Sequence, residues 1–313
     1  MKIFPIAIAI LIGVTLLIEF GLRLTVGLGN PPLYIADEEI GYLLAPNQKL
    51  RRRGNLIKVN QYSMRSDEIE PEKPDNRFRV FLLGDSIVNG GWWTDQTEIL
   101  SEFIETEIAQ MSDRPVEAIN ASANSWGPRN QLAYLQKFGL FDADVLILVI
   151  NTDDLFATAP TSVQVGRDLN YPNRRPPLAL IELYQRYLAK SPEIPELEKV
   201  RKEPGDRVGR NLQAIEEIKH LAAANNTQFI LAMTPLLREL QGDGSREYEL
   251  KARKRLQEFT ANQNITYIDF LPIFADFPQP EFLYRDSIHL TVQGNHMVSK
   301  TLAESAFSVI SEQ

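Results

Sequence analysis

The chain of 313 residues contains no cysteine, only three histidines and fewer basic than acidic residues. The absence of cysteine excludes disulfide bonds, thiolate metal sites and a cysteine nucleophile. The formal net charge of −8 argues against a nucleic-acid partner, because phosphate binding requires a basic surface. Any chemistry that requires an imidazole must use His220, His289 or His296.

Several short motifs are also absent. The sequence contains neither the Gly-x-x-x-x-Gly-Lys nor the Gly-x-Gly-x-x-Gly pattern of phosphate-binding loops. It also lacks the Gly-x-Ser-x-Gly elbow of common α/β hydrolases. No pattern indicates a metal ion or an organic cofactor, so the expected chemistry depends on side chains alone.

A long apolar segment opens the chain. No charge occurs from Ile3 to Ile18, and extension to Leu24 reaches the roughly 20 residues that cross a bilayer. Glu19 and Arg23 are spaced to pair at the membrane surface. We therefore expect residues 1–28 to form one transmembrane helix that contacts the lipid bilayer as an uncleaved signal anchor. A cleaved signal peptide is the competing interpretation.

The remaining chain is expected outside the cytoplasm, because a lone N-terminal hydrophobic segment normally serves export. Residues 29–76 are rich in proline, asparagine and charge and are expected to form an extension or linker. A strand is possible at 56–65. The arginine run at 51–53 favours a solvated face or a contact with anionic headgroups over a specific site.

Strand and helix patterns alternate in residues 77–313. This alternation predicts an α/β domain, a three-layer α/β/α sandwich with a central parallel sheet of about five strands. The predicted strands are 77–84, 115–122, 143–152, 227–235 and 265–270, and the predicted helices are 96–111, 129–139, 211–226, 245–263 and 291–311.

An insertion at 155–210, with one helical pattern at 178–191, interrupts the alternation. Insertions after a strand's carboxyl end lie above the ligand crevice of such sheets. The segment is therefore expected to be either a lid or substrate platform, or a mobile surface insertion.

Ser86 follows the first buried strand of this domain, in Gly84-Asp85-Ser86. The turn after a parallel strand faces the sheet edge where ligands bind. A nucleophilic serine needs a base, and the base needs an orienting group. His289 and Asp286, three residues apart in YRDSIHLTVQGNH, supply both. In contrast, His220 is expected to be structural or exposed and His296 to be a packing residue.

Two blocks of the chain resemble the SGNH/GDSL hydrolase family. GDSIVNG at 84–90 is similar to its first block and DSIHLTVQGNHMV at 286–298 to its last. The resemblance extends from about Arg77 to Phe307. It implies a flavodoxin-like SGNH hydrolase fold and a Ser86–His289–Asp286 triad. Such a protein would cleave or transfer an ester-linked acyl group through an acyl-enzyme. The substrate is expected to be a small-molecule ester or an ester of a cell-envelope glycan or lipid, and the glycan rests on the expected compartment and on the tryptophans described below.

The resemblance also implies an oxyanion hole. Its donors would be the backbone N–H groups of Ser86 and Ser122 and, in the third block NTDD, the side chain at Asp153. An ionised aspartate only accepts hydrogen bonds and would repel the oxyanion, and loss of one donor costs about 3–4 kcal/mol. Asp153 could be protonated by burial, Asn151 could donate instead, or backbone amides could suffice. Alternatively, the protein is a catalytically impaired binding or scaffolding module.

All three tryptophans lie beside the predicted site. Trp92 and Trp93 follow the first block and Trp126 follows the second. In these loops they are suited to stack on a sugar ring or to line an acyl pocket. The alternative is that they anchor the loops as apolar packing residues.

Overall fold

A five-stranded parallel sheet lies at the centre of the structure, a computed structural model that describes residues 3–190, 192–242 and 244–311. All neighbouring strands are parallel. In spatial order the strands are β6 (Val116–Ser122), β5 (Phe78–Gly84), β7 (Val145–Asn151), β8 (Gln228–Thr234) and β9 (Thr266–Asp269). Each coincides with a strand that the sequence predicts.

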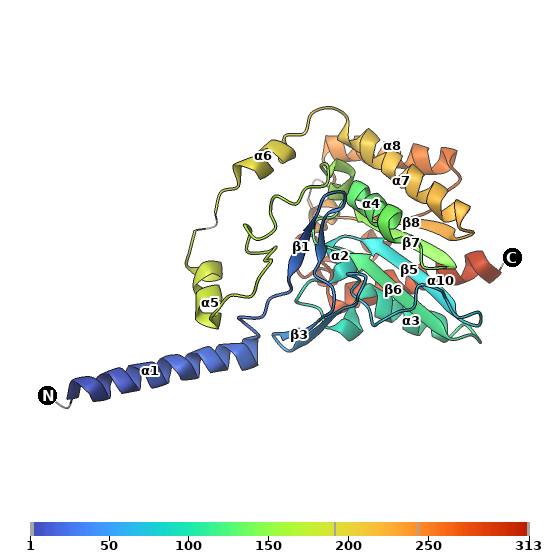
Figure 1. Ribbon diagram of the computed structural model, residues 1–313. Coiled ribbons are helices and arrows are strands. Elements are labelled where there is room, and N and C mark those ends of the chain that lie inside the picture. The colour runs from blue at the N-terminus through green and yellow to red at the C-terminus, as the bar shows by residue number, and fades with distance from the viewer. Residues whose placement is uncertain (1–2, 191, 243, 312–313) are drawn as a thin grey trace.

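Helices cover both faces of the sheet (Figure 1). One face carries α4 (Pro128–Phe138), α7 (Arg207–Ala224) and α8 (Glu247–Asn262). The other carries α3 (Leu100–Ala109), α9 (Phe270–Ala275) and α10 (Val292–Ser311). This arrangement confirms the predicted three-layer α/β/α fold.

The strand β7 shows why both faces must be covered. Its side chains alternate between two hydrophobic clusters, because successive residues of a strand point to opposite faces. Leu146, Leu148 and Ile150 pack toward α4 and α7. Val145 and Ile147 pack toward α3 and α10. An uninterrupted apolar strand therefore marks a sheet that is buried on both sides.

Two predicted helix boundaries differ from the structure. The helix predicted at 96–111 divides into the 3₁₀ turn η2 (Gln96–Glu98) and α3, because Ile99 between them is extended, with φ −80° and ψ 161°. The helix predicted at 211–226 begins earlier, at Arg207. The Asp206 side chain accepts a hydrogen bond from the backbone of Gly209 and so caps the helix.

Within residues 29–76, the part from 34 to 59 folds into two antiparallel hairpins. These are β1 (Tyr34–Asp37) with β2 (Gly41–Leu44), and β3 (Gln48–Arg52) with β4 (Asn55–Val59). Buried residues of the hairpins, among them Tyr42 and Ile57, belong to the same hydrophobic cluster as the sheet. The segment is therefore packed against the α/β domain rather than extended as a linker, and only β4 overlaps the strand pattern at 56–65.

The N-terminal helix projects away from the rest of the protein (Figure 1). It consists of α1 (Ile3–Gly21) and the π-helical turn η1 (Leu22–Val26). By length and composition, Phe4–Val26 is able to cross a membrane, and little of it is buried. Gly27 ends it with φ +73°, where a Cβ would lie 2.3 Å from the Arg51 carbonyl oxygen. Residues 1 and 2 of the predicted anchor lie outside the described residues.

The arginine run at the β3–β4 turn is not uniformly solvated. Arg51 and Arg53 are exposed, but Arg52 is only 4% exposed and forms a 2.5 Å ion pair with Glu182. The prediction of a solvated or headgroup-binding run is therefore wrong for Arg52, whose carboxylate partner lies far along the sequence.

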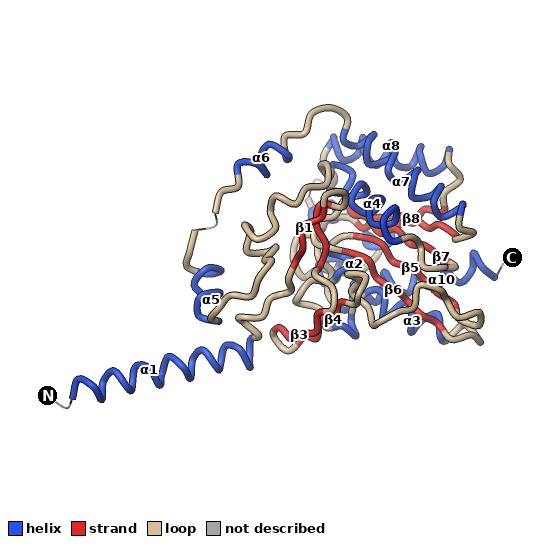
Figure 2. The backbone as a smooth tube through the Cα atoms, viewed as in Figure 1, coloured by secondary structure: helices blue, strands red, loops and turns tan. Residues whose placement is uncertain are grey.

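The insertion at 155–210 is mostly loop (Figure 2). It begins within the turn η3 (Thr152–Phe156), contains the helices α5 (Ala179–Tyr187) and α6 (Pro195–Arg201), and ends in the first turn of α7. Residue 191, at the end of the predicted helix, lies outside the described residues. Glu203 pairs with Arg129 of α4 at 2.7 Å, and these hydrogen bonds lower the pKa of Glu203 to about 2. This contact fastens one end of the insertion to the domain.

Candidate active site

Ser86 lies at the carboxyl end of β5. The chain leaves the strand at Gly84, where a Cβ would lie 2.3 Å from the Val88 side chain. Asp85 then caps the short helix α2 (Ser86–Asn89) by accepting a hydrogen bond from the backbone N–H of Ile87 at 2.8 Å. Ser86 is the first residue of this helix and is 8% exposed. The fold thus places its hydroxyl at the ligand-binding edge of the sheet.

His289 and Asp286 lie in the loop between the turn η5 (Pro280–Leu283) and α10. The Nε2 atom of His289 is 3.0 Å from the Ser86 Oγ, and its Nδ1 is 2.9 Å from an Asp286 carboxylate oxygen. Burial raises the pKa of Asp286. The backbone N–H groups of His289 and Ile288 donate to the carboxylate and outweigh burial, so the pKa lies below its ordinary value. The three side chains predicted to act together therefore form one hydrogen-bonded series.

The three tryptophans occupy two different environments. Trp93 packs edge-on against the His289 ring with centroids 4.5 Å apart, and Arg285 lies over both Trp92 and Trp93. Trp126 is only 1% exposed and donates its indole N–H to the Tyr42 carbonyl at 2.9 Å. The predicted substrate contact is therefore wrong for Trp126, which packs between α4 and the first hairpin.

A cavity of about 650 Å³ opens beside Ser86 and His289. The ends of the central strands contribute polar residues to its wall, including Asn151 and Asp153. The hairpin extension contributes Tyr34 and Tyr42. Residues of the insertion complete it, including Gln164, Tyr171, Arg186 and Arg201. The insertion therefore forms part of the wall of the cavity, as a substrate platform would.

The second block does not place Ser122 at the cavity. The Ser122 hydroxyl is buried and donates to the Asn120 side chain at 2.5 Å, and Ser122 does not line the cavity. Ser125 lines it instead and has φ +60°, a left-handed conformation that glycine ordinarily occupies. Its backbone N–H has no acceptor within the described part of the chain. The turn composition of Asn124-Ser125 is the signal that could have located this donor.

Asn151 is not available as a substitute donor. Its side-chain amide donates to Asp85 at 2.8 Å and to Asp154 at 3.0 Å, so both of its protons are used. Burial raises the pKa of Asp85, and burial together with Asp85 raises the pKa of Asp154 well above its usual range. The prediction that Asn151 could replace the missing donor is therefore wrong, because it links two buried carboxyl groups.

Asp153 lines the cavity, and its side chain is exposed there. Partial burial raises the pKa of Asp153, an effect that the positive charge of Arg238 opposes. A protonated carboxyl group can donate one hydrogen bond, whereas the ionised group can only accept. The protonation state of Asp153 therefore decides whether it favours or opposes negative charge in the cavity.

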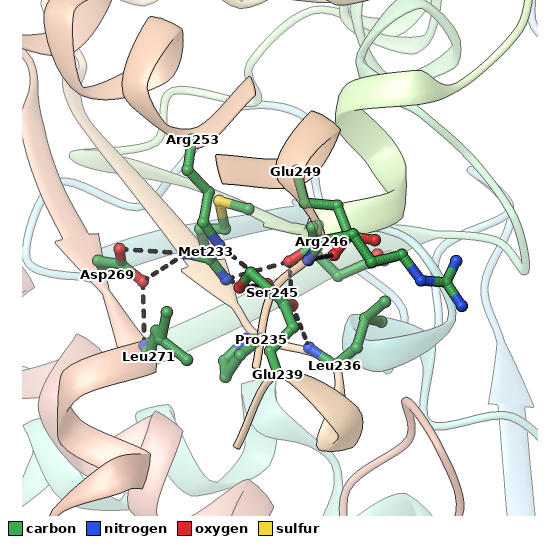
Figure 3. A network of polar contacts seen from close by, with 12 residues as sticks. Met233, Pro235, Leu236, Glu239, Ser245, Arg246, Glu249, Arg253, Asp269 and Leu271 are labelled. Atoms are coloured by element: carbon green, nitrogen blue, oxygen red, sulfur yellow. Dashed lines mark hydrogen bonds and ion pairs between the residues drawn. The ribbon is translucent and has the colours of Figure 1, made fainter. Parts of the chain in front are cut away.

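Figure 3 shows a buried ionic network in which Arg253 lies between Glu239 and Asp269. The network also reaches Thr152, next to Asp153. Arg253 of α8 donates to Glu239 in the turn η4 (Leu237–Leu240), to Asp269 at the end of β9 and to the Thr152 hydroxyl. Thr152 in turn donates to Glu239 at 2.5 Å. The backbone preceding Asp153 is thereby fixed from three elements of the domain.

The other two histidines lie away from the cavity. His220 is exposed on α7, and the His296 Nε2 lies 3.1 Å from a Glu107 carboxylate oxygen while its ring packs on Phe103. Among the described residues, no three His, Asp or Glu side chains are grouped so that they could hold a metal ion.

A serine, a histidine and an aspartate hydrogen-bonded in series at the edge of a parallel α/β sheet are the arrangement of a serine hydrolase. The sequence model of the GDSL-like lipase/acylhydrolase family matches residues 82–297. The chain belongs to this family. No curated protein matches the chain in sequence.

Solved structures resemble the chain at low sequence identity. They include a lipase/acylhydrolase from Enterococcus faecalis, with 15% identity, a TM-score of 0.46 and coverage of 73% of this chain and 94% of the other. An acetyl xylan esterase, AlAXEase, has 15% identity and a TM-score of 0.48, and the match covers 73% of this chain and 99% of the other. The esterase EstA from Pseudoalteromonas sp. has 12% identity and a TM-score of 0.44, and the match covers 76% of this chain and 100% of the other.

Proposed function

We infer that the protein is an ester hydrolase with Ser86 as nucleophile. The observation that carries the proposal is the 3.0 Å contact between the Ser86 Oγ and the His289 Nε2, together with the 2.9 Å contact between His289 Nδ1 and Asp286. Membership of the GDSL-like lipase/acylhydrolase family supports the same chemistry.

In the proposed reaction, the His289 Nε2 accepts the Ser86 hydroxyl proton as the Oγ attacks the carbonyl carbon of an ester. Asp286 stabilises the resulting imidazolium and holds the ring with Nδ1–H toward its carboxylate. The imidazolium then protonates the leaving alcohol, and an acyl-enzyme remains on Ser86. A water molecule, deprotonated by His289, releases the acid. If an alcohol of a sugar replaces the water, the same steps transfer the acyl group.

The oxyanion that forms during attack needs donors near Ser86. We assign this role to the backbone N–H groups of Ser86 and Ser125. Ser125 replaces Ser122 in this assignment because Ser125 lines the cavity and its N–H has no acceptor within the described part of the chain. Backbone donors of this kind typically contribute about 3–4 kcal/mol each to the transition state.

The substrate is proposed to be an O-acyl ester of a cell-envelope glycan or lipid. A cavity of about 650 Å³ is in the range that accommodates a small organic ligand. Its wall combines aromatic rings, such as Trp93 and Tyr171, with polar side chains, a combination suited to a sugar ring. Acyl transfer would be recognised if transfer to an added sugar exceeded hydrolysis.

The protein is proposed to be a single-pass membrane protein with its α/β domain outside the cytoplasm. The span Phe4–Val26 supports an anchor by its length and composition. Intact mass measurement of the protein from membranes tests this, because retention of residues 1–28 is expected and their loss would indicate a cleaved signal peptide.

A second candidate function is ligand binding without turnover. It is favoured by one observation, the Asp153 carboxylate in the cavity wall where a donor is expected. A serine-directed fluorophosphonate that labels only an Asp153→Asn protein, and not the wild type, would support this alternative.

The direct test of hydrolysis is the Ser86→Ala variant assayed with p-nitrophenyl acetate. We expect a loss of about 10⁴-fold or more in kcat, because the nucleophile is removed. Ser308→Ala on the outer part of α10, where Ser308 is exposed, is the matched control and should retain full activity. Equal rates for Ser86→Ala and the wild type would refute the proposed nucleophile.

A further inference from the structure

The helix α5 of the insertion has an unusual distribution of side chains. Its inward side carries Glu182, which is 3% exposed and paired with Arg52 and Arg186. Ala179 is also buried, and Leu180, Ile181 and Leu183 are half-buried. Four large apolar or aromatic residues of the helix and its two flanks face outward instead, and they form what we call the α5 apolar face. Their exposed fractions are 45% for Leu178, 58% for Tyr184, 58% for Tyr187 and 75% for Leu188. A surface helix in contact with water typically carries polar residues on its outer side, so four large exposed apolar or aromatic side chains on one short helix are unusual.

The first turn of α5 is attached to the end of the N-terminal helix. Both carboxylate oxygens of Glu19 accept hydrogen bonds from this turn, from the backbone N–H groups of Ala179 at 2.8 Å and Leu180 at 3.0 Å. Arg23 pairs with Glu19 at 2.6 Å and also donates to the Pro177 carbonyl. Figure 1 shows α5 beside α1. These bonds fix the position of α5 along the axis of α1.

That position coincides with the end of the apolar part of the helix. Glu19 is the first charged residue after Lys2, and the exposed Phe20 and Leu24 follow it. A hydrocarbon layer about 30 Å thick, which roughly 20 helical residues cross, would therefore end between Glu19 and Leu24. With α1 in a bilayer, α5 lies at the boundary between hydrocarbon and headgroups.

The residues around α5 suit this boundary. Tyrosine is enriched where membrane meets water, and two of the four residues of the α5 apolar face are tyrosines. Tyr187 also accepts a hydrogen bond from Arg53 of the β3–β4 turn at 2.9 Å. Arg174, Arg175 and Lys190 flank the helix and are exposed, so they can approach lipid phosphates.

We propose that the α5 apolar face is a membrane-contact surface, which inserts into the interfacial layer of the bilayer that α1 crosses. The inference rests on the proposed membrane anchor. Because Arg186 of α5 also lines the active-site cavity, lipid contact would hold the insertion, and with it one wall of the cavity, at the membrane surface.

The absence of cysteine makes a direct test simple. Single cysteines at Leu188 (L188C), at Leu250 (L250C) and at Leu17 (L17C) are labelled with the fluorophore NBD in the full chain. The labelled proteins are reconstituted into vesicles of phosphatidylcholine and phosphatidylglycerol, with or without bromine on the lipid chains. Leu250 on α8 is the matched control, since it is 54% exposed and α8 lies at the opposite side of the protein from α1 (Figure 1). Leu17 reports on the anchor.

We expect blue-shifted emission and bromolipid quenching at positions 188 and 17, and water-like, unquenched emission at position 250. If position 17 is quenched while position 188 behaves like position 250, the contact surface is refuted and the anchor stands. If neither is quenched, the anchor is refuted and the inference about α5 is refuted with it. Equal quenching at 188 and 250 would also refute it, because the effect would then not be specific to α5.

Discussion

The two sides of Ser86 are built differently. On one side, His289 and Asp286 come from one short loop and are already within hydrogen-bond distance of each other and of the hydroxyl. On the other side, the cavity wall carries the carboxyl groups of Asp85, Asp153 and Asp154. We call the first the base side, and its hydrogen bonds are complete in the protein alone. We call the second the oxyanion side, and in the proposed reaction it would depend on backbone amides and on the protonation of Asp153.

The difference indicates where the rate of the proposed reaction is limited. A carboxylate within the cavity raises the energy of a developing oxyanion, whereas a neutral donor lowers it. The side-chain amide of Asn151 cannot compensate, since Asp85 and Asp154 accept both of its protons. We therefore expect substitutions on the base side to abolish activity and a substitution at Asp153 to increase it.

The largest effect should come from the base side, in Asp286→Asn. The amide cannot stabilise the imidazolium and favours the wrong tautomer of His289, so kcat/KM should fall about 10³–10⁴-fold. The measurement is ester hydrolysis at neutral pH. Asp276→Asn, at an exposed carboxylate nearby in sequence, should leave the rate unchanged. An Asp286→Asn protein with wild-type activity would refute the role of Asp286 in orienting and stabilising His289.

The next effect is on stability and concerns the ionic network of Arg253, Glu239 and Asp269, which supports the oxyanion side. In Arg253→Met, Glu239 and Asp269 lose their buried cationic partner, which should lower the free energy of unfolding by about 3–5 kcal/mol. Urea denaturation measures it. The matched control on the same helix is Arg255→Met, which breaks an exposed pair with Asp206 that is worth about 0–1 kcal/mol. Similar losses for both variants would show that the network does not stabilise this side of the site.

A smaller effect, of opposite sign, is expected for Asp153→Asn. Removal of the charge and gain of a donor should raise kcat about 10- to 100-fold with p-nitrophenyl acetate. The control is Asp168→Asn, because Asp168 is a carboxylate of the insertion that also lines the cavity. A lower rate in Asp153→Asn would mean that the carboxylate assists the reaction, and the contrast between the two sides would disappear.

The pH dependence of this increase follows from the raised pKa of Asp153. Below that pKa the wild-type carboxyl is protonated and can donate, so the two proteins should have similar rates. As the pH rises through it, the wild type acquires the opposing charge and the rate ratio of Asp153→Asn to wild type should grow to a plateau. The measurement is kcat/KM for both proteins from acidic to neutral pH. A constant ratio would contradict this role for Asp153.

Much of the fold could be predicted because its signals are local. The strand β7 is apolar from Val145 to Ile150, and β5 is apolar from Val80 to Leu83. Apolar runs of this kind are typical of a sheet that is covered on both faces. The pairing of Asp286 with His289 could also be predicted, because residues three positions apart in one loop can bring their side chains together. Ser86 was placed by the turn that follows β5.

The features that were missed depend on contacts distant in sequence. The strands of the hairpins at 34–59 are only four or five residues long, and their burial arises from packing on the domain. Nothing local distinguishes Trp126 from Trp93, although one is packed under the first hairpin and the other beside His289. Likewise, Asn151 is engaged by Asp85, which is 66 residues away.

The central claim, that His289 activates Ser86, is tested most directly by fluorophosphonate labelling of the purified full chain and identification of the modified peptide by mass spectrometry. We expect a stoichiometric adduct on Ser86 in the wild type, much slower labelling in His289→Ala and none in Ser86→Ala. A wild-type protein without an adduct on Ser86, or one that labels equally fast after His289→Ala, would contradict it.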